Sequence, residues 1–265
     1  GFEYAWSPDG KWFTLCFIGN KHDPYSDIGI VSAQGGNITN LTNSGYTSGS
    51  PRWVMDGNAI LFATERYGMR NHASWGSMED VMLCFVNQDA YDKYRLSKED
   101  YELLKEVEKE QEKLKKGADK KDEKKEETKE NKNIVIELDG IQDRIVRLTP
   151  NSSSLGSAII DKKGEILYYT AAFESGMDLW KIDLRKKDVK LMTKNVGYAS
   201  FEMSKDGKHI FLLGSRMQKM DAASGKLTPI SYNGSLKMDL ADEREAMFDH
   251  VYKQQQKRFY NVNMH

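Results

Sequence analysis

Residues 4–13 read YAWSPDGKWF, two apolar strand signals joined by a tight turn. The turn has a clear chemistry, because proline presets φ, aspartate binds nearby backbone amides and glycine adopts the positive φ that a tight hairpin needs. The unit returns as PRWVMDGNAILF at 51–62, AIIDKKGEILY at 158–168 and SFEMSKDGKHIF at 200–211. The copy at 158–168 lacks the Pro-Asp pair and is the weakest match. The sequence therefore predicts four related β-hairpins.

Further strand signals follow these hairpins. They lie at 27–31 and 38–42, at 178–184 and 189–193, and at 217–221 and 227–230. Four short strands in a unit of about 40–50 residues are typical of a β-propeller blade. We therefore expect an all-β fold, a β-propeller of about four blades over residues 1–235. Because closed propellers often have six or seven blades, we expect the ring to be incomplete, with its first blades missing.

One interval between the turn glycines is too long for a single blade. From Gly57 to Gly164 the chain exceeds one unit by about 60 residues, which indicates an insertion. Residues 88–133 are polar, and Ser97 before an acidic turn predicts a helix N-cap. The tract 113–132 is nearly all Lys, Glu and Asp, so it offers little to a core and its deletion is expected to leave the fold unchanged. We expect a charged insertion in the second blade, helical or disordered, with strand signals resuming at 134–138 and 144–149.

Beyond residue 235 the pattern changes from β to helical. Apolar residues between 238 and 259 fall roughly on one helical face, and Asp239 or Asp242 is placed to cap its start. We expect 236–265 to be the start of a second, helical domain. Since the sequence opens at Gly1 without Met or a signal peptide, we also expect a piece of a longer protein.

The composition argues against several classes of protein. The 39 basic and 40 acidic side chains give a net charge of −1, whereas nucleic-acid binders carry a clustered basic excess. No apolar run reaches the roughly 18–20 residues that a membrane span needs. Two cysteines, Cys16 and Cys84, cannot form a disulfide framework, and a bond between them would require neighbouring strands.

The sequence contains no recognisable catalytic or metal-binding motif. There is no Gly-x-Ser-x-Gly elbow, phosphate-binding glycine loop or His-Glu-x-x-His, and the five histidines are scattered. The Asp-Gly pairs lack the Asp spacing of a calcium loop, so turn chemistry explains them. We expect no catalytic residues, no metal and no cofactor. Four tryptophans are expected to pack between blades: Trp6, Trp12, Trp53 and Trp180.

One loop has the composition of a binding site. Residues 64–79 bring Arg66, Arg70 and Trp75 together between two strands, and arginine with aromatic residues is typical of binding hot spots. The two arginines suit a peptide carboxylate. The alternative is that this loop only packs beneath the charged insertion.

Three stretches carry a family resemblance. WSPDGK at 6–11 resembles the repeats of TolB-type propellers, which several peptidases share. DGIQDRIVRL at 139–148 and the segment from MFD at 247 to RFYNVNMH at 258–265 are more specific. Together they resemble tricorn-type serine peptidases over essentially the whole chain, in the bacterial form with a charged insertion.

The resemblance implies that peptide handling and catalysis belong to different domains of the protein. In that family a propeller precedes a helical domain, a PDZ domain and a catalytic domain with the nucleophilic serine, so this chain would stop before the catalytic residues. It would admit or route peptides or unfolded proteins to the downstream active site, and would be periplasmic or exported, with the cytoplasm as the alternative. The competing interpretation is a TolB-like module that binds a protein partner and serves no protease. A propeller enzyme with its own active site would need converging acids or histidines, which the repeats do not offer.

Overall fold

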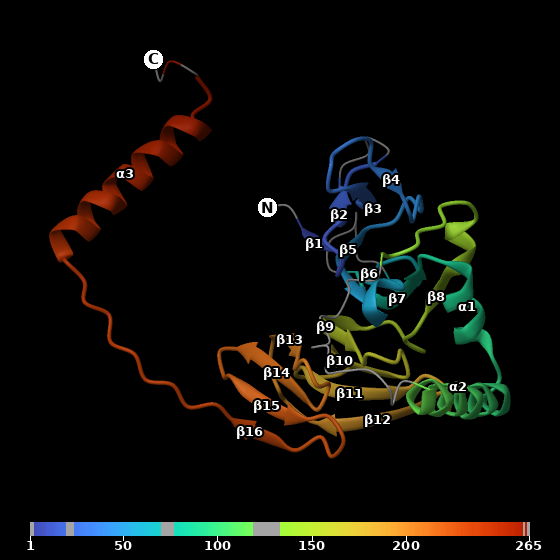
Figure 1. Cartoon of the computed structure of the whole chain (residues 1–265). Helices are drawn as coiled ribbons and strands as arrows, with labels where there is room; N and C mark the ends of the chain where they lie inside the picture. The colour runs from blue at the N-terminus through green and yellow to red at the C-terminus, as the bar shows by residue number, and fades with distance from the viewer. Residues whose placement is uncertain (1–2, 20–23, 70–76, 119–132, 262, 264–265) are drawn as a thin grey trace. The chain divides into compact units, whose positions relative to one another are not determined.

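The computed structural model describes residues 3–19, 24–69, 77–118, 133–261 and 263, in two compact units, Gly1–Ile230 and Ser231–His265. The described part of the first unit contains four antiparallel sheets, each of four strands in chain order (Figure 1). The all-β organisation in four-stranded modules is thereby confirmed.

The strands follow the four repeats of the sequence. Sheet 1 is β1 (Tyr4–Trp6), β2 (Trp12–Phe17), β3 (Asp27–Ser32) and β4 (Thr39–Asn40). Sheet 2 is β5 (Ser48–Val54), β6 (Ala59–Thr64), β7 (Asp80–Phe85) and β8 (Ile145–Arg147). Sheet 3 is β9 (Ser154–Ile160), β10 (Ile166–Ala172), β11 (Asp178–Asp183) and β12 (Asp188–Thr193). Sheet 4 is β13 (Ala199–Met203), β14 (His209–Gly214), β15 (Gln218–Asp221) and β16 (Leu227–Pro229).

The turn between β1 and β2 has the predicted chemistry. The Ser7 hydroxyl donates to the Asp9 carboxylate at 2.6 Å and accepts from the Trp12 amide at 2.9 Å, while Gly10 has a φ of +70°. The turn at Ser204 in sheet 4 repeats these bonds at 2.6 and 2.9 Å. The side-chain bonds replace water at amides that a tight turn would otherwise leave unpaired.

The Asp-Gly turn of sheet 2 differs from this pattern. Met55 and Asp56 both have positive φ, +53° and +52°, ahead of Gly57 at +90°. The Ile134 side chain lies where a Cβ on Gly57 would be, so the returning insertion packs directly onto the turn. Glycine is required here for close approach as well as for its backbone angle.

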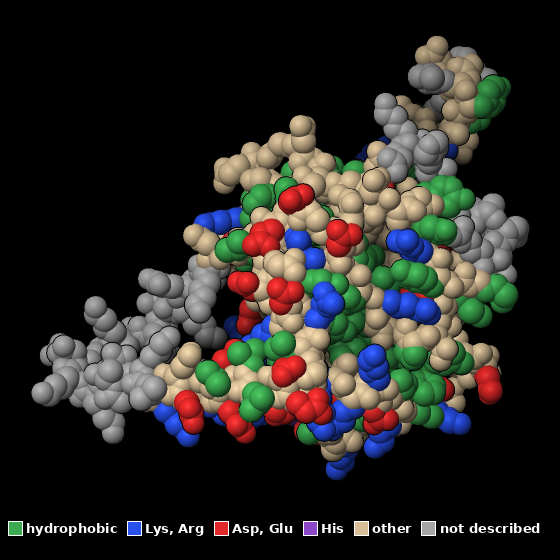
Figure 2. Space-filling model, turned by 90° about the vertical axis from the view of Figure 1, so that its right-hand side faces the viewer, with side chains coloured by type: hydrophobic (Ala, Val, Ile, Leu, Met, Phe, Trp, Pro, Cys, Tyr) green, Lys and Arg blue, Asp and Glu red, His purple; other side chains and the backbone are tan. Residues whose placement is uncertain are grey.

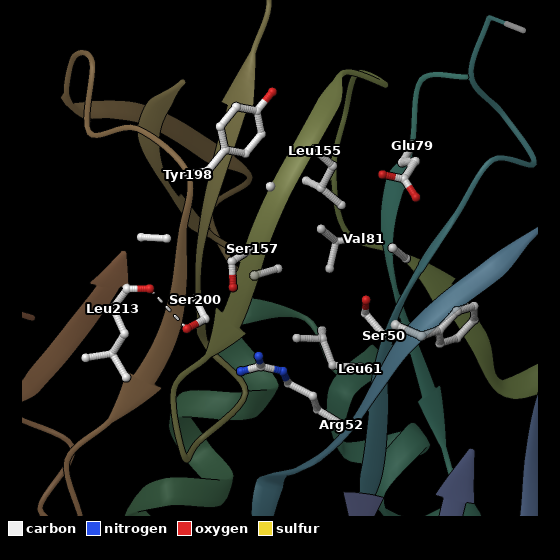
Figure 3. A pocket seen from close by; sticks show the side chains of 15 residues that line it. Ser50, Arg52, Leu61, Glu79, Val81, Leu155, Ser157, Tyr198, Ser200 and Leu213 are labelled. Atoms are coloured by element: carbon white, nitrogen blue, oxygen red, sulfur yellow. Dashed lines mark hydrogen bonds between the residues drawn. The ribbon is translucent and has the colours of Figure 1, made fainter. Parts of the chain in front are cut away.

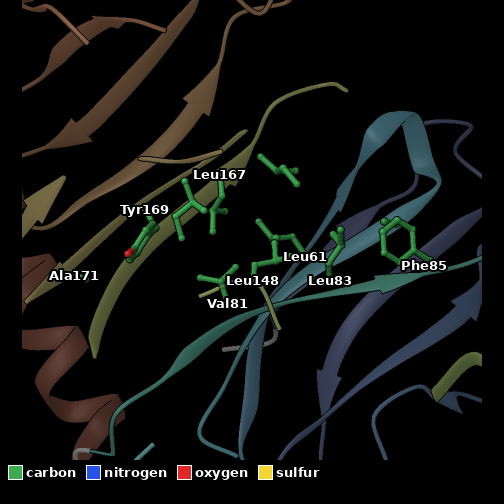
Figure 4. Packing of buried hydrophobic residues seen from close by; sticks show 11 residues of the cluster. Leu61, Val81, Leu83, Phe85, Leu148, Leu167, Tyr169 and Ala171 are labelled. Atoms are coloured by element: carbon green, nitrogen blue, oxygen red, sulfur yellow. The ribbon is translucent and has the colours of Figure 1, made fainter. Parts of the chain in front are cut away.

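The core consists of three apolar clusters, each shared by two consecutive sheets. The cluster between sheets 2 and 3 takes alternate residues of β7, among them Leu83 and Phe85, and meets Leu167 and Tyr169 of β10 (Figure 4). The other alternate residues of β7, including Cys84, belong to the cluster between sheets 1 and 2. β7 is therefore buried on both faces, and each such side chain contributes roughly 1.5–3 kcal/mol.

The tryptophans follow the packing prediction with one exception. Trp12 and Trp53 pack at the interface of sheets 1 and 2, and Trp180 at that of sheets 2 and 3. Trp6, in contrast, is 56% exposed, on the face of sheet 1 that points away from sheet 2. It stacks on Phe13 of the same sheet at 3.8 Å between ring centroids. The expectation that Trp6 packs between sheets is therefore wrong, because no described element covers that face.

The described part of the insertion forms two helices. α1 (Gln88–Arg95) and α2 (Lys98–Ala118) leave β7, and Ser97 caps α2 by accepting from the Asp100 amide at 3.1 Å, as predicted. The strand predicted at 134–138 does not form; in that segment the Glu137 amide donates to the Val86 carbonyl at 2.8 Å and the Ile134 amide donates to the Asp9 carboxylate at 3.0 Å. The apolar residues of the segment pack against the turn of sheet 2 and do not form a hydrogen-bonded strand pair.

Arg185, in the turn between β11 and β12 of sheet 3, binds the insertion to sheet 3. Its guanidinium donates to the carbonyls of Lys93, Tyr94 and Leu96 at 3.0, 2.6 and 3.1 Å, which caps the C-terminus of α1. It also lies 3.9 Å from the ring centroid of the buried Tyr101. An insertion that begins in sheet 2 is thus tied to sheet 3.

The second unit contains α3 (Leu240–Arg258), capped by Asp239, whose carboxylate accepts from the Ala241 amide at 2.9 Å. The predicted helix and one of its two candidate caps are confirmed. Several of its apolar side chains are exposed, including Phe248 at 72%. Among the described residues, no helix has the length and apolar character that crossing a bilayer requires.

Candidate functional site

The first strands of the four sheets border a common central space. One cavity is lined by residues of β1, β5, β9 and β13. A second cavity of about 530 Å³ adjoins it, sharing Ser50, Arg52 and Leu61, and lies between sheets 2, 3 and 4 (Figure 3). Each of these strands is hydrogen-bonded on one side only within its sheet, so backbone groups along its other edge face the cavity. We call the 530 Å³ space the channel cavity.

Arg52 projects into the channel cavity from β5 (Figure 3). The pairing of β5 with β6 shifts register between Gly49 and Arg52, at a bulge where Ser50 has a φ of +55°. A bulge redirects the side chains that follow it. The Arg52 guanidinium donates to the Phe201 carbonyl of β13 at 2.8 Å and lies 3.9 Å from the exposed Glu202 carboxylate.

Glu79 lines the same cavity from the end of β7. Its backbone bridges Ser153, with N–H···O distances of 2.8 and 3.1 Å, so the position of the residue is fixed. Burial raises the pKa of its carboxyl to about 7, and the negative charges of Glu65, Glu3 and Asp80 add to the shift. A partly buried carboxyl with a pKa near neutrality is the most perturbed acid on this wall.

Apolar and hydroxyl side chains complete the lining. Leu61, Val81 and Leu155 form the walls, and Tyr198, which is 73% exposed, lies at the edge. The Ser157 hydroxyl accepts from the Phe201 amide at 3.2 Å, which links β9 to β13. Apolar walls with a few placed polar groups are typical of a ligand site.

Metal-binding clusters and free thiols are two possible sources of chemistry in a protein. The described residues contain no group of three or more His, Cys, Asp or Glu side chains that could hold a metal ion. Both cysteines are free thiols; burial raises the pKa of Cys84 to about 12 and also raises that of Cys16. Protonated thiols are poor nucleophiles, and neither cysteine lines the channel cavity.

The loop predicted to bind peptide lies at the same end of sheet 2 as Glu79. Arg66 is exposed, 5.6 Å from the ring centroid of Tyr67, and does not line the channel cavity. Arg70 and Trp75 lie outside the described residues. Because Thr64 pairs with Asp80 whereas Ala59 pairs with Phe85, this loop and the insertion leave opposite ends of the sheet. The alternative in which the loop packs beneath the insertion stays a prediction, because residues 70–76 and 119–132 lie outside the described residues.

Sequence reasoning missed Arg52 and Glu79. A signal for Arg52 existed: five residues before the turn glycines the repeats carry Ala5, Arg52, Ile159 and Glu202. Two of the four copies, Arg52 and Glu202, are charged where the other two are apolar, and a charged residue at such a position points to a special role. Glu79 had no such signal, because its environment depends on residues far away in the sequence.

The surface gives a further indication about ligands. On the face shown in Figure 2, acidic and basic side chains are interspersed, with hydrophobic side chains between them. Such a face produces no large field of one sign.

Comparison with known proteins establishes the fold. No family model matches the chain. The tricorn protease superposes with a TM-score of 0.63 at 10% identity, over 99% of this chain and 25% of its own. A puromycin-hydrolyzing peptidase of Mycobacterium tuberculosis superposes with a TM-score of 0.51 at 9% identity, over 91% of this chain and 30% of its own. The resemblance to the tricorn protease is thereby confirmed at the level of fold.

One curated relative shares sequence similarity with a segment of the chain. An uncharacterized peptidase of Bacillus subtilis, YuxL, is 39% identical over 56 residues, which is 21% of this chain and 8% of that protein. TolB of Acinetobacter baumannii shares 13% identity with a TM-score of 0.49, over 86% of this chain and 43% of its own. The chain thus spans a minor part of each of these proteins.

Proposed function

We propose that this chain is a non-catalytic propeller segment of a larger serine peptidase. It binds extended peptides or unfolded segments in the channel cavity and passes them to an active site elsewhere in the protein. The observation that carries the proposal is the cavity itself, with its apolar walls and with strand edges that no further strand of their own sheet pairs. Free edges pair with extended peptides through the backbone, so they suit a ligand of variable sequence.

The proposal includes partners within the same protein. α3 would begin a helical domain, followed by PDZ and catalytic domains as in the tricorn-type arrangement that the sequence resembles. The compartment would then be the periplasm or the exterior, where such relatives act.

The exposed face of sheet 1 supports an incomplete ring. Ile60, Leu167 and Ile210 stand at one position of sheets 2, 3 and 4, and all three are fully buried against the preceding sheet. The equivalent Phe13 is only partly buried, and Trp6 beside it is 56% exposed. An apolar face of this kind calls for a preceding blade.

Peptide binding tests the proposal directly. A fluorescently labelled unstructured decapeptide should bind the chain, as measured by fluorescence anisotropy, without being hydrolysed. Ser200→Trp would fill the cavity that Ser200 lines, and should abolish binding. Ser215→Trp, on an exposed residue outside the cavity, is the matched control and should bind normally. Equal binding by both variants would contradict the proposal.

A second candidate function is a protein-interaction module, favoured by the exposed aromatic face of sheet 1. In that case a folded partner protein would bind, Trp6→Ser would abolish the interaction, and Ser200→Trp would leave it unchanged. Trp6→Ser and Ser200→Trp together therefore separate the two functions.

A further inference from the structure

The channel cavity has two oppositely charged groups on different elements. Arg52 extends from β5, whereas Glu79 precedes β7, and both line the same 530 Å³ space (Figure 3). Between them the walls are apolar, with Leu61 and Val81 among them. A cavity with a cation in one place and an acid in another can distinguish the two ends of a peptide.

Arg52 is held in place but retains unused donors. Its Nη1 donates to the Phe201 carbonyl, which fixes the guanidinium against β13. Its other contact, to Glu202, is long at 3.9 Å, and the Glu202 side chain is 64% exposed, so it is weak. Within the described part of the chain, no hydrogen bond occupies Nε or Nη2. An arginine whose Nε and Nη2 donors are both unoccupied can bind a carboxylate through two parallel hydrogen bonds.

Glu79 is the complementary group. Its carboxylate has no hydrogen bond or ion pair among the described residues, although its backbone is fixed by Ser153. Glu65 and Glu3 are close enough to make the surroundings negative. A bound ammonium group would supply the missing counter-charge, whereas a carboxylate would be repelled.

We infer that the channel cavity binds peptides in one direction, with the free carboxylate of the peptide on Arg52 and its amino group beside Glu79. The inference rests on the proposed peptide binding and adds the class of ligand: short peptides with both termini free. The raised pKa of Glu79 agrees with this arrangement, because a cation beside the carboxyl would restore its ionised form. The reverse direction would place like charges together at both ends.

Peptides with blocked ends test the direction. Four versions of one pentapeptide, labelled on a central side chain, would carry free or acetylated amino ends and free or amidated carboxyl ends. We expect the doubly free peptide to bind the native chain most tightly, with about tenfold weaker binding for each blocked end, the effect of losing one charged hydrogen-bonded contact.

Variants assign each end to a residue. Arg52→Gln should weaken binding of the free-carboxylate peptides about tenfold and leave the amidated ones unchanged, while Glu79→Gln should act only on peptides with a free amine. Unchanged binding of the insensitive peptide shows that each variant is folded. Arg216→Gln, on an exposed arginine that does not line the cavity, is the matched control and should bind all four peptides normally.

The possible results distinguish directional binding from the proposed binding of peptides in the channel cavity. If all four peptides bind equally and Ser200→Trp abolishes their binding, peptides use the cavity without direction and the inference is overturned alone. If Glu79→Gln acts on the carboxylate end, the direction is reversed and the inference is also wrong. If none of the peptides binds, both the inference and the proposed function fail.

Discussion

At the scale of single residues, a few polar side chains connect parts of the chain that are distant in sequence. The carboxylate of the fully buried Asp80 accepts a hydrogen bond from Thr149 at 2.7 Å and forms an ion pair with Arg147 at 2.9 Å. These contacts join the start of β7 to residues that follow the insertion. Asp27 bonds Thr42 at 2.7 Å in the same way in sheet 1. Buried carboxylates of this kind are tolerated only because they are fully paired.

Arg185 offers a direct test of such a connection. Arg185→Met should lower the free energy of unfolding by about 1.5–3 kcal/mol, because three carbonyls at the end of α1 lose a charged donor. It should also speed proteolytic cleavage in the insertion. Urea denaturation and limited proteolysis measure the two effects. Arg216→Met, on an exposed residue, is the control. Equal effects of both variants would show that Arg185 does not bind the insertion to sheet 3.

Glu79 should make stability depend on pH. Its pKa is raised from 4.5 to about 7 in the folded chain, so the folded state binds its proton more tightly than the unfolded state does. The resulting stabilisation is present below pH 4.5 and is lost as the pH rises to about 7. The Glu79→Gln variant should therefore gain about 1–2 kcal/mol relative to the native chain between these pH values, after allowance for partial exposure. Thermal unfolding across this range measures the difference, and a constant difference would contradict the assignment.

At the scale of elements, the two parts of the insertion should differ in importance. α1 and the start of α2 pack on sheets 2 and 3 through Tyr94, Tyr101 and Arg185, whereas the tract 113–132 contains one large apolar residue. Deleting 113–132 should leave the thermal midpoint within about 2 °C of the native value, and deleting 88–133 should lower it by several degrees. Differential scanning calorimetry measures both. A large loss from the shorter deletion would show that the charged tract is structural.

The elements also show which features the sequence could predict. Turns of the Ser-x-Asp-Gly type were predictable because their bonds are local, as at Ser7 and Ser204. The turn at Gly57 was not, since its shape depends on Ile134, which arrives after the insertion. The segment 134–138 has strand composition, but strand pairing requires a partner edge that the sequence does not reveal.

The candidate site was less predictable than the strands. The sequence placed the binding residues in the loop 64–79, and of that loop only Glu79 among the described residues lines the channel cavity. Arg52 acquires its role from the Phe201 carbonyl, two sheets further along the chain. A site built between modules depends on how the modules pack, and hydrophobic periodicity within one module carries no such information.

At the scale of the first unit, the uncovered face of sheet 1 is the surface that we expect to cause self-association. Tyr4 and Trp6 are 62% and 56% exposed, beside the partly buried Phe13. We expect the 265-residue chain to self-associate through this face, since contiguous exposed apolar surface drives association. The double variant Tyr4→Ser, Trp6→Ser should reduce the weight-average mass at high concentration in sedimentation equilibrium. Tyr232→Ser, a similarly exposed tyrosine, should not; equal behaviour would place the contact elsewhere.

The position of the insertion also has a kinetic consequence. β7 and β8 are neighbours in sheet 2 but are separated by about 60 residues, so bringing them together costs about 2 kcal/mol more chain entropy than closing a four-residue hairpin. A ribosome adds about 5–20 residues per second, so β8 emerges about 3–12 s after β7. During that interval the backbone N–H and C=O groups on one edge of the apolar strand β7 have no partner strand, and this edge is the point at which a chaperone would protect the nascent chain.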